Sequence, residues 1–432
     1  MGKREHFGST GAAVLALAGS AIGLGNIWRF PYMVGENGGA AFIILYLIFI
    51  LAISVPILLC ESIIGRSAQS STFTAMETLA PGTKWKWLGI LTVVSPLIIL
   101  SFYSIVGGWS IGFFFKSIFE GFSIGNTGYF SSMVQDTWMP IIYHTIFLGL
   151  TAIIVSAGVK SGIERFNKLS LPVLFVFIIL IAAYSLFLPG ARDGVTYLLK
   201  PDFSRITAKT LANAMGQGFF SLSLGVGTIL TYSSYMRRED SILRSGLGTA
   251  VFDVMFAIIA GFAVMPAVFA AKIEPTAGPG LIFESLPFVF AKMGAEGLPV
   301  ISRLISIIFF FTIIVAALTS SISMFEVGVA YLVEEKGVSR RKAVMLLFAG
   351  IWALGCICSL FPKVFDFCDK LTSNYLMTFG GLLFVIFVGW KMKKKSVSTE
   401  LNAPRIFNAF YFFVKYIAPV VIVLIFLTNL FG

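Results

Sequence analysis

The sequence predicts an all-α polytopic membrane protein. Of its 432 residues, 57% are hydrophobic and only 12% are charged, about half the charged share of an ordinary soluble domain. Apolar runs long enough to cross a bilayer as helices recur along the whole chain. The net charge of +11 would suggest a nucleic-acid partner. Because the basic residues flank the apolar runs, however, we expect no nucleic acid and a lipid bilayer instead.

Eleven apolar runs are each predicted to form a transmembrane helix. They lie near residues 9–34, 38–64, 88–119, 140–158, 166–188, 208–234, 242–271, 299–333, 341–361, 366–390 and 406–430. Several are longer than the hydrocarbon requires, so these helices tilt or extend beyond it. No connection is long enough to hold a soluble domain, and residues 1–432 are expected to form one domain.

The distribution of basic residues predicts the orientation in the membrane. If the N-terminus lies in the cytoplasm, most of the 32 Lys and Arg residues fall in cytoplasmic connections, including the segment KMKKKSVSTE at 391–400. We therefore expect a multi-pass protein of the bacterial cytoplasmic (inner) membrane. Its N-terminus is cytoplasmic, its C-terminus is extracytoplasmic, and its basic excess faces anionic lipid.

The first apolar run contains residues that break a membrane helix. The stretch AIGLGNIWRFPY at 21–32 carries Gly23, Gly25, Asn26, Arg29 and Pro31. Glycines alone are also typical of a close helix–helix contact. Asn26 and Arg29 favour a functional break, because polar groups are costly inside a membrane. Backbone groups that a break frees need protein or water partners, and they can bind a ligand.

The sixth run contains a second break, in QGFFSLSLGVGTILTYSSY at 217–235. Discontinuous helices one and six are five spans apart. That spacing is typical of transporters built from two inverted repeats of five helices each. Here the 5+5 inverted repeat would comprise about 9–188 and about 208–390, with an eleventh helix at about 406–430. In such folds helix N-termini face an anionic substrate group and unwound carbonyls hold a cation.

The chain resembles the neurotransmitter:sodium symporter family, and within it the bacterial amino-acid transporters. The resemblance covers about residues 3–430. It rests on REHFGSTGA, GNIWRFPY, ENGGAAF, CESIIGR, GIERFNK, GQGFFSLSLGVG and LTSSIS, which occur in the family's order. It implies sodium-coupled symport of an amino acid into the cell by alternating access. The alternatives are a sodium-dependent amino-acid sensor without net transport, a channel, and a transporter of another carboxylate or amine.

The resemblance implies two bound sodium ions held by oxygen ligands, which hard cations prefer. Sodium site 1 would use Ala21, Asn26, Ser221 and Asp253 together with the substrate carboxylate. Sodium site 2 would use the carbonyls of Gly19, Ile22 and Ala316 and the hydroxyls of Thr319 and Ser320. Taken alone, a run of hydroxyl residues such as 319–321 is equally typical of hydrogen bonding between helices.

The resemblance also implies the substrate site. Amides of Leu24 and Gly25 and the Tyr103 hydroxyl would hold the carboxylate. The full set of expected residues is Ala21, Leu24, Gly25, Ile99, Tyr103, Phe220, Ser221, Ser223, Val226, Ser320 and Met324. Val226 stands where the family's leucine transporter has a phenylalanine. The extra space favours a bulky hydrophobic or aromatic amino acid, although the adaptable Met324 could refill it.

Two charge pairs match the family's gates. Arg29 and Asp369 correspond to the outer pair, and Arg4 and Glu334 to the inner pair. The interval from Gly162 to Pro172 matches a spacing at which family members unwind the fifth helix toward the cytoplasm.

One departure from the family concerns chloride, which supplies a negative charge at this site in animal members of the family. Asp253 stands where relatives have an asparagine sodium ligand, and Ala257 stands where the leucine transporter has a glutamate. The positions that match the chloride shell are Tyr46, Gln217 and Ser221. We therefore predict chloride-independent transport, with Asp253 as the fixed negative charge.

Other chemistries find little support in the sequence. The four cysteines lack the spacing of a metal site, and no base accompanies a candidate nucleophile. We expect no catalytic residues and no cofactor other than sodium.

Overall fold

The computed structural model describes residues 5–124, 128–272 and 281–431. Within these ranges the secondary structure is entirely helical. The α-helices are α1 (Thr10–Ala21), α2 (Phe30–Glu36), α3 (Ala40–Phe49), α4 (Val55–Ala68), α5 (Thr72–Leu79), α6 (Lys86–Phe119), α7 (Tyr129–Gln135), α8 (Met139–Ser156), α9 (Arg165–Leu186), α10 (Ala191–Leu199), α11 (Ala208–Ser221), α12 (Thr228–Ser233), α13 (Ile242–Ala270), α14 (Leu286–Ala295), α15 (Pro299–Lys336), α16 (Arg340–Leu360), α17 (Pro362–Lys370), α18 (Met377–Ile386), α19 (Lys394–Leu401), α20 (Pro404–Phe412) and α21 (Ala418–Phe431).

Short segments of other helix types join several of these helices into longer spans. They are η1 (Gly25–Arg29), η2 (Ile50–Ser54), η3 (Val159–Glu164), η4 (Phe203–Arg205), η5 (Leu281–Ser285), η6 (Leu371–Leu376), η7 (Phe387–Lys391) and η8 (Phe413–Ile417). All are π-helical except the 3₁₀ turn η4. The chain therefore runs as one helix through, for example, α3, η2 and α4.

Nine helical stretches in the described ranges are long and apolar enough to cross a membrane. They are Ala40–Ala68, Lys86–Phe119, Met139–Ser156, Val159–Leu186, Ile242–Ala270, Pro299–Lys336, Arg340–Leu360, Pro362–Lys391 and Pro404–Thr428. A tenth is the broken pair Thr10–Ala21 and Gly25–Glu36, bent by 51°. The predicted sixth span is divided into α11 and α12, each too short to cross a membrane alone.

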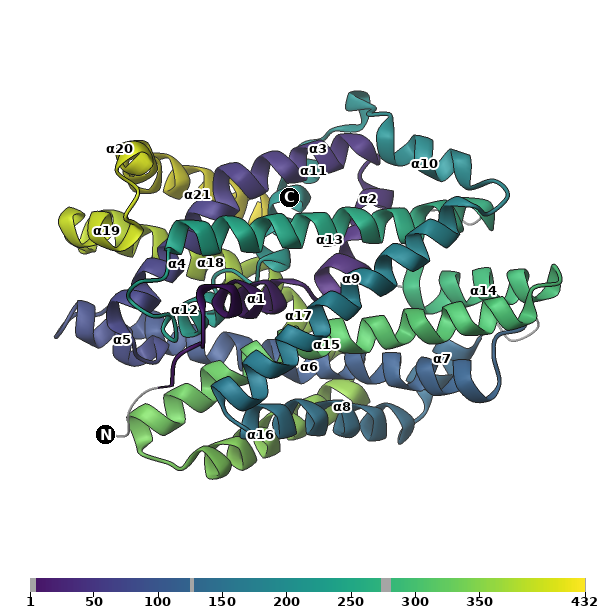
Figure 1. The fold of residues 1–432 in the computed structure, drawn as a ribbon, viewed down its shortest axis with the longest axis horizontal. Helices are drawn as coiled ribbons and strands as arrows, with labels where there is room; N and C mark the ends of the chain where they lie inside the picture. Colours follow the sequence, from purple (N-terminus) through teal and green to yellow (C-terminus); the bar gives the residue numbers. More distant parts are fainter. Residues whose placement is uncertain (1–4, 125–127, 273–280, 432) are drawn as a thin grey trace.

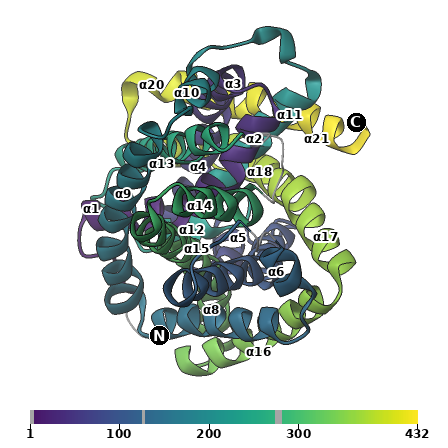
Figure 2. The same cartoon turned by 90° about the vertical axis from the view of Figure 1, so that its right-hand side faces the viewer.

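The long helices lie side by side along the length of the molecule (Figure 1). Turned by 90°, the view shows α12 and α15 inside the bundle, with α8, α9, α16 and α17 around them (Figure 2). Burial agrees with this arrangement. In the most apolar part of Lys86–Phe119, 72% is buried inside the protein, against 28% for Arg340–Leu360. The peripheral helices therefore expose most of their apolar surface to lipid.

The break between α11 and α12 is packed directly against α18. Gly225 has φ +81°, a left-handed conformation that favours glycine. A Cβ on Gly225 would lie 1.9 Å from the Met377 carbonyl oxygen, and a Cβ on Gly380 would lie 2.0 Å from the Gly225 carbonyl oxygen. Only hydrogen atoms fit at both positions. The two glycines thus set how closely the broken span approaches α18.

We predict that Gly380→Ala destabilises the protein by about 1–3 kcal/mol, because the methyl group overpacks a backbone contact. Gly350→Ala is the matched control, since Gly350 also lies within a helix and a Cβ there would meet no atom within 4 Å. Thermal unfolding in detergent, followed by tryptophan fluorescence, compares the two. A lower unfolding temperature for Gly380→Ala alone supports the packing, and equal temperatures would contradict it.

Candidate functional site

The first span breaks where the chain must pass between two other helices. Ile22, after the end of α1, is extended, with φ −72° and ψ 109°. A Cβ on Gly23 would lie 2.2 Å from the Ser320 Oγ and 2.9 Å from the Tyr103 Oη. The glycine therefore lets the unwound segment touch α15 and α6 at once.

The second break lies against the first. Residues 222–227 separate α11 from α12, and Ser223, a residue with a side chain, has φ +52° there. The Ser223 hydroxyl donates to the Ser20 carbonyl over 2.9 Å. The Gln217 amide donates to the Gly25 carbonyl over 2.9 Å. Side chains of one broken span thus satisfy carbonyls of the other, as a membrane interior requires.

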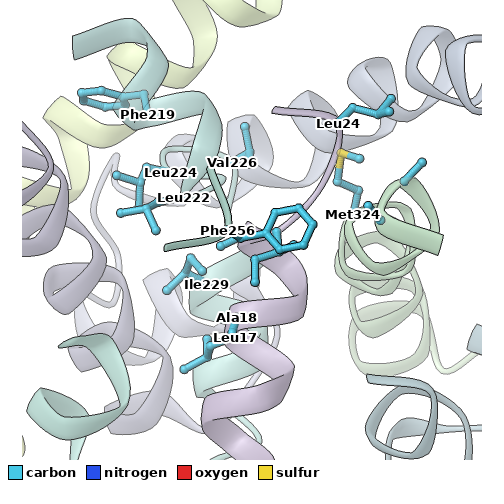
Figure 3. Close-up of a cluster of buried hydrophobic side chains, with 14 of the residues drawn as sticks. Leu17, Ala18, Leu24, Phe219, Leu222, Leu224, Val226, Ile229, Phe256 and Met324 are labelled. Carbon is cyan, nitrogen blue, oxygen red and sulfur yellow. The ribbon is translucent and has the colours of Figure 1, made fainter. Parts of the chain in front are cut away.

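A cavity with an empty volume of about 380 Å³ lies between the two breaks, α6, α15 and α18. Its lining is Ala21, Gly23, Gly25, Ile99, Tyr103, Phe220, Ser223, Val226, Ser320, Met324 and Met377. Figure 3 shows Val226 in the segment between α11 and α12, and Met324 on α15. Nine of the residues expected at the substrate site line this cavity.

The other two expected residues, Leu24 and Ser221, lie just behind the cavity wall. The Leu24 amide donates to the Tyr103 Oη over 3.1 Å, and the Ser221 hydroxyl turns toward Asp253. Gly23 and Met377 line the cavity without having been expected there. Met377 lies on α18, whose register against the breaks cannot be read from its apolar sequence.

Asn26, Ser221 and Asp253, three of the four residues expected at sodium site 1, meet around a buried carboxylate, together with Tyr46. Asp253 on α13 accepts hydrogen bonds from the Asn26 amide (2.7 Å), the Ser221 hydroxyl (2.8 Å) and the Tyr46 hydroxyl (3.2 Å). All four side chains are fully buried. No ion pair in the described part of the chain involves Asp253. A buried negative charge without a counter-charge is costly, so this group favours a bound cation.

The side chain of Asn26, an expected sodium ligand, has its amide nitrogen and not its oxygen directed at Asp253. The Asn26 side-chain oxygen accepts from the Gly23 amide over 3.0 Å, and its nitrogen faces Ser221 and Asp253. The side-chain oxygen of Asn26, which was expected to bind sodium, therefore points away from Asp253 in this structure. Asn26 instead closes the turn at the first break, and rotation of its amide would supply the oxygen.

Most residues expected at sodium site 2 also meet. The Thr319 Oγ1 lies 2.8 Å from the Ile22 carbonyl oxygen and 2.7 Å from that of Ala316. The Ser320 Oγ lies 3.5 Å from the same Ile22 oxygen. These oxygen atoms form a neutral set of the kind that a hard cation accepts. The fifth member, Gly19, packs against Asn167, whose Oδ1 would lie 2.4 Å from an added Cβ.

Two buried polar residues beside the site were not anticipated. The Glu61 Oε1 on α4 accepts from the Gly225 amide over 2.7 Å, so a carboxylate caps the second break. Asn167 on α9 is fully buried, and neither of its side-chain polar atoms has a partner among the described residues. Both lie within motifs noted in the sequence, CESIIGR and GIERFNK, but nothing in those motifs shows which break they face.

The expected outer gate is not closed as an ion pair. Among the ion pairs of the described residues, none joins Arg29 to Asp369. Arg29 lies 4.7 Å from the centre of the Phe220 ring and donates to the Gly216 carbonyl over 3.3 Å. Asp369 accepts from the Ser373 hydroxyl. Arg29 therefore covers the aromatic wall of the cavity instead of pairing across it.

The inner gate is only partly within the described residues, because Arg4 lies outside them. Its expected partner Glu334 accepts from the Ser71 amide over 2.5 Å.

The N-terminal segment is held by other contacts. The Thr10 hydroxyl donates to Asp240 over 2.5 Å, and the Gly8 amide donates to Glu164 over 2.9 Å. Burial raises the pKa of Asp240, but hydrogen bonds from Thr10 and Arg237 outweigh it and leave the pKa below its usual value.

The fifth span is helical throughout in this structure. Val159–Leu186 is one helical stretch, with Gly162 in η3 and Pro172 inside α9. The unwinding that the glycine–proline interval suggested is therefore absent from this stretch, which the structure describes in full. η3 instead packs closely on α8, since a Cβ on Gly162 would lie 2.1 Å from the Ile154 carbonyl oxygen.

Known proteins match this chain over almost its whole length. The model of the sodium:neurotransmitter symporter family matches residues 4–125 and 130–432. An uncharacterized sodium-dependent transporter of Haemophilus influenzae is 35% identical over 99% of both chains. The sodium-dependent transporter YhdH of Bacillus subtilis, also uncharacterized, is 36% identical over 97% of this chain and 96% of its own.

A solved structure confirms the fold class. The crystal structure of MhsT in complex with L-phenylalanine superposes with a TM-score of 0.90 at 37% identity, covering 99% of this chain and 100% of that one. The predicted polytopic all-α fold with two discontinuous helices, and the resemblance noted from the sequence motifs, are both confirmed.

We predict that Asp253→Asn removes most of the stabilisation that sodium gives the purified protein. Wild-type protein at a sodium concentration 100 times the dissociation constant should gain about 2.7 kcal/mol. The variant should gain little, because its buried carboxylate is gone. Unfolding temperatures in NaCl and KCl test this, with Asp366→Asn at an exposed aspartate of α17 as the matched control. An equal sodium effect in wild type and Asp253→Asn would show that the negative charge of Asp253 is not what holds sodium.

Proposed function

Because the chain belongs to the sodium:neurotransmitter symporter family, we propose that it carries a hydrophobic or aromatic amino acid into the cell together with sodium. The observation that carries the proposal is the cavity between the two broken helices. One side of this cavity offers unwound backbone and hydroxyl groups, and the other is apolar. An α-amino acid has the same division between a charged end and a side chain.

The polar side of the cavity suits a carboxylate. The Leu24 amide and the Tyr103 hydroxyl already lie 3.1 Å apart, and each can donate a hydrogen bond to a carboxylate oxygen. The Ser223 hydroxyl and the carbonyls of the first break lie nearby and can accept from an amine. This pairing of donors and acceptors favours a zwitterion over a simple amine or a simple acid.

The apolar side of the cavity sets the substrate class. Ile99, Phe220, Val226, Met324 and Met377 line it. The small Val226 leaves room, and the two methionines are flexible enough to adapt to side chains of different shape. The solved relative MhsT was crystallised with L-phenylalanine, which is consistent with a bulky apolar or aromatic substrate for this chain.

Sodium coupling follows from the charge at sodium site 1. Asp253 supplies one buried negative charge, and the substrate carboxylate would add another beside it. A sodium ion between them would be attracted to both carboxylates and would reduce their mutual repulsion, so sodium and substrate should each raise the other's affinity. A second sodium would occupy the oxygen set of Ile22, Ala316, Thr319 and Ser320.

The same carboxylate argues against a chloride requirement. Asp253 lies within hydrogen-bonding distance of Tyr46 and Ser221, two of the positions that match the chloride shell. Its negative charge would repel an anion there and would replace the charge that chloride supplies in animal relatives. The buried Ala257 adds no charge.

The whole chain would act as one transporter of the bacterial cytoplasmic membrane. The two five-helix repeats, about 9–188 and 208–390, would rock around the cavity. The basic end of the bundle would face the cytoplasm, with the N-terminus inside and the C-terminus outside.

Ion replacement tests the coupling by counterflow, in proteoliposomes that are loaded with unlabelled phenylalanine or leucine and receive the radiolabelled amino acid from outside. Replacing sodium by potassium or choline should abolish high-affinity uptake, whereas replacing chloride by gluconate should leave uptake unchanged. Protein-free liposomes are the control. Equal uptake in sodium and choline would refute symport, and a loss of uptake in gluconate would refute the assignment of Asp253.

Arg29→Ala should lower uptake by about tenfold, because the loss of its contacts with Phe220 and Gly216 uncovers the cavity. Lys200→Ala, which removes an exposed basic residue, should leave uptake unchanged. The measurement is the initial rate of amino-acid uptake by wild type and by both variants in the same proteoliposomes. If Asp369→Ala is also fully active, Asp369 has no part in the outer gate.

A further inference from the structure

A basic cavity lies at one end of the bundle, where the α5–α6 connection meets α19. α5 and α19 lie at the same end of the molecule (Figure 1). The cavity encloses about 1280 Å³ of empty space, part of it open to solvent, between Ser67, Pro81, Lys391, Lys393 and Lys395. We call these five residues the basic cup.

The cup carries uncompensated positive charge. One acidic residue, Glu400, also lines the cavity. Glu400 is paired with Arg66 (2.8 Å) and Arg238 (2.9 Å), so its charge is already neutralised. In the described ranges, no ion pair involves Lys391, Lys393 or Lys395, and all three side chains are exposed. The neighbouring Lys394 differs, because it lies over the Tyr411 ring at 5.4 Å. The Ser67 hydroxyl is buried and has no partner among the described atoms.

An apolar groove adjoins the cup on its membrane side. Its lining includes Trp85, Trp87, Leu91, Phe379 and Leu383, around about 880 Å³ of empty space. We call these residues the apolar groove. Trp87 is 62% exposed and Phe379 is 44% exposed, so the aromatic surface faces lipid.

The same two segments of chain line both cavities. Residues 79–81 line the cavity of the cup, and six residues between 83 and 91 line the groove. The helix that carries Phe379 at the groove continues to Lys391 at the cup. Trp85 packs edge-on against Phe387, with ring centres 5.0 Å apart, and joins the segments midway. A ligand could therefore lie in both at once.

We propose that the basic cup and the apolar groove together bind one anionic phospholipid of the adjoining leaflet. The phosphate would meet the three lysines and the Ser67 hydroxyl, and an acyl chain would run along the groove. A soluble anion would leave the groove empty, and a neutral lipid would leave the lysines unpaired. Basic pockets between membrane helices bind acidic headgroups in this way.

Binding at this place would connect the lipid to the central cavity. The helix that bears Phe379, Leu383 and Lys391 also bears Met377, which lines the central cavity, and Gly380, which contacts the second break. The lipid would hold the basic end of this helix against the start of α6. It would thereby stabilise two elements that form walls of the cavity.

Native mass spectrometry of the detergent-purified full chain tests the proposal. The protein is titrated with phosphatidylglycerol or with phosphatidylcholine of the same acyl chains. Wild type should retain phosphatidylglycerol about tenfold better or more, from the combined attraction of three lysines. The triple variant Lys391→Gln, Lys393→Gln, Lys395→Gln should lose this preference. The triple variant Lys336→Gln, Arg341→Gln, Lys342→Gln, at exposed basic residues elsewhere, should keep it.

Two further arms separate the parts of the site. Leu383→Trp, which fills the groove, should weaken retention of phosphatidylglycerol, whereas Val94→Trp at an exposed position of α6 should not. Glycerol 3-phosphate should compete poorly, because it lacks acyl chains. Equal retention of the two lipids by wild type, an equal loss in both triple variants, or full competition by glycerol 3-phosphate would each overturn the proposal.

Discussion

Two broken helices determine much of this structure, because the backbone groups that they expose inside a membrane must all be satisfied. Lipid offers no hydrogen bonds, so each freed amide or carbonyl must find a protein partner or a ligand. Thr319 donates to the Ile22 carbonyl, Ser223 donates to the Ser20 carbonyl, and Glu61 accepts from the Gly225 amide. These partners come from α15, the other break and α4. The breaks therefore draw distant parts of the chain into one site.

A second constraint is electrical. Asp253 lies fully buried among hydrogen-bond donors, with no ion pair in the described residues. Hydrogen bonds reduce the cost of a buried charge but do not neutralise it. A site of this kind is most stable when it holds a cation, which is the physical basis of coupling in the proposed mechanism. The oxygen set around Thr319 is neutral, so the two expected sodium ions would be held in different ways.

The helix from Pro362 to Lys391 connects three features that lie far apart in the molecule. In its first third, Asp369 accepts a hydrogen bond from Ser373 of the same helix. In the middle, Met377 lines the cavity and Gly380 contacts the second break. At its other end, Lys391 enters the basic cup. Movement of this one helix would alter the central cavity and the proposed lipid site together.

The sequence by itself determined the membrane class and the two breaks, and it proposed residues for the site. Helix-breaking and polar residues within apolar runs have few physical explanations in a bilayer. The motifs around Asn26, Ser221 and Thr319 contain residues that lie close to the two breaks in the structure. Only the tertiary structure decided which way the Asn26 amide turns, that Arg29 covers Phe220 without pairing with Asp369, and that Glu61, Asn167 and Met377 lie beside the breaks. Those features depend on the register and rotation of helices that are apolar on all sides, and hydrophobic periodicity carries no information about either.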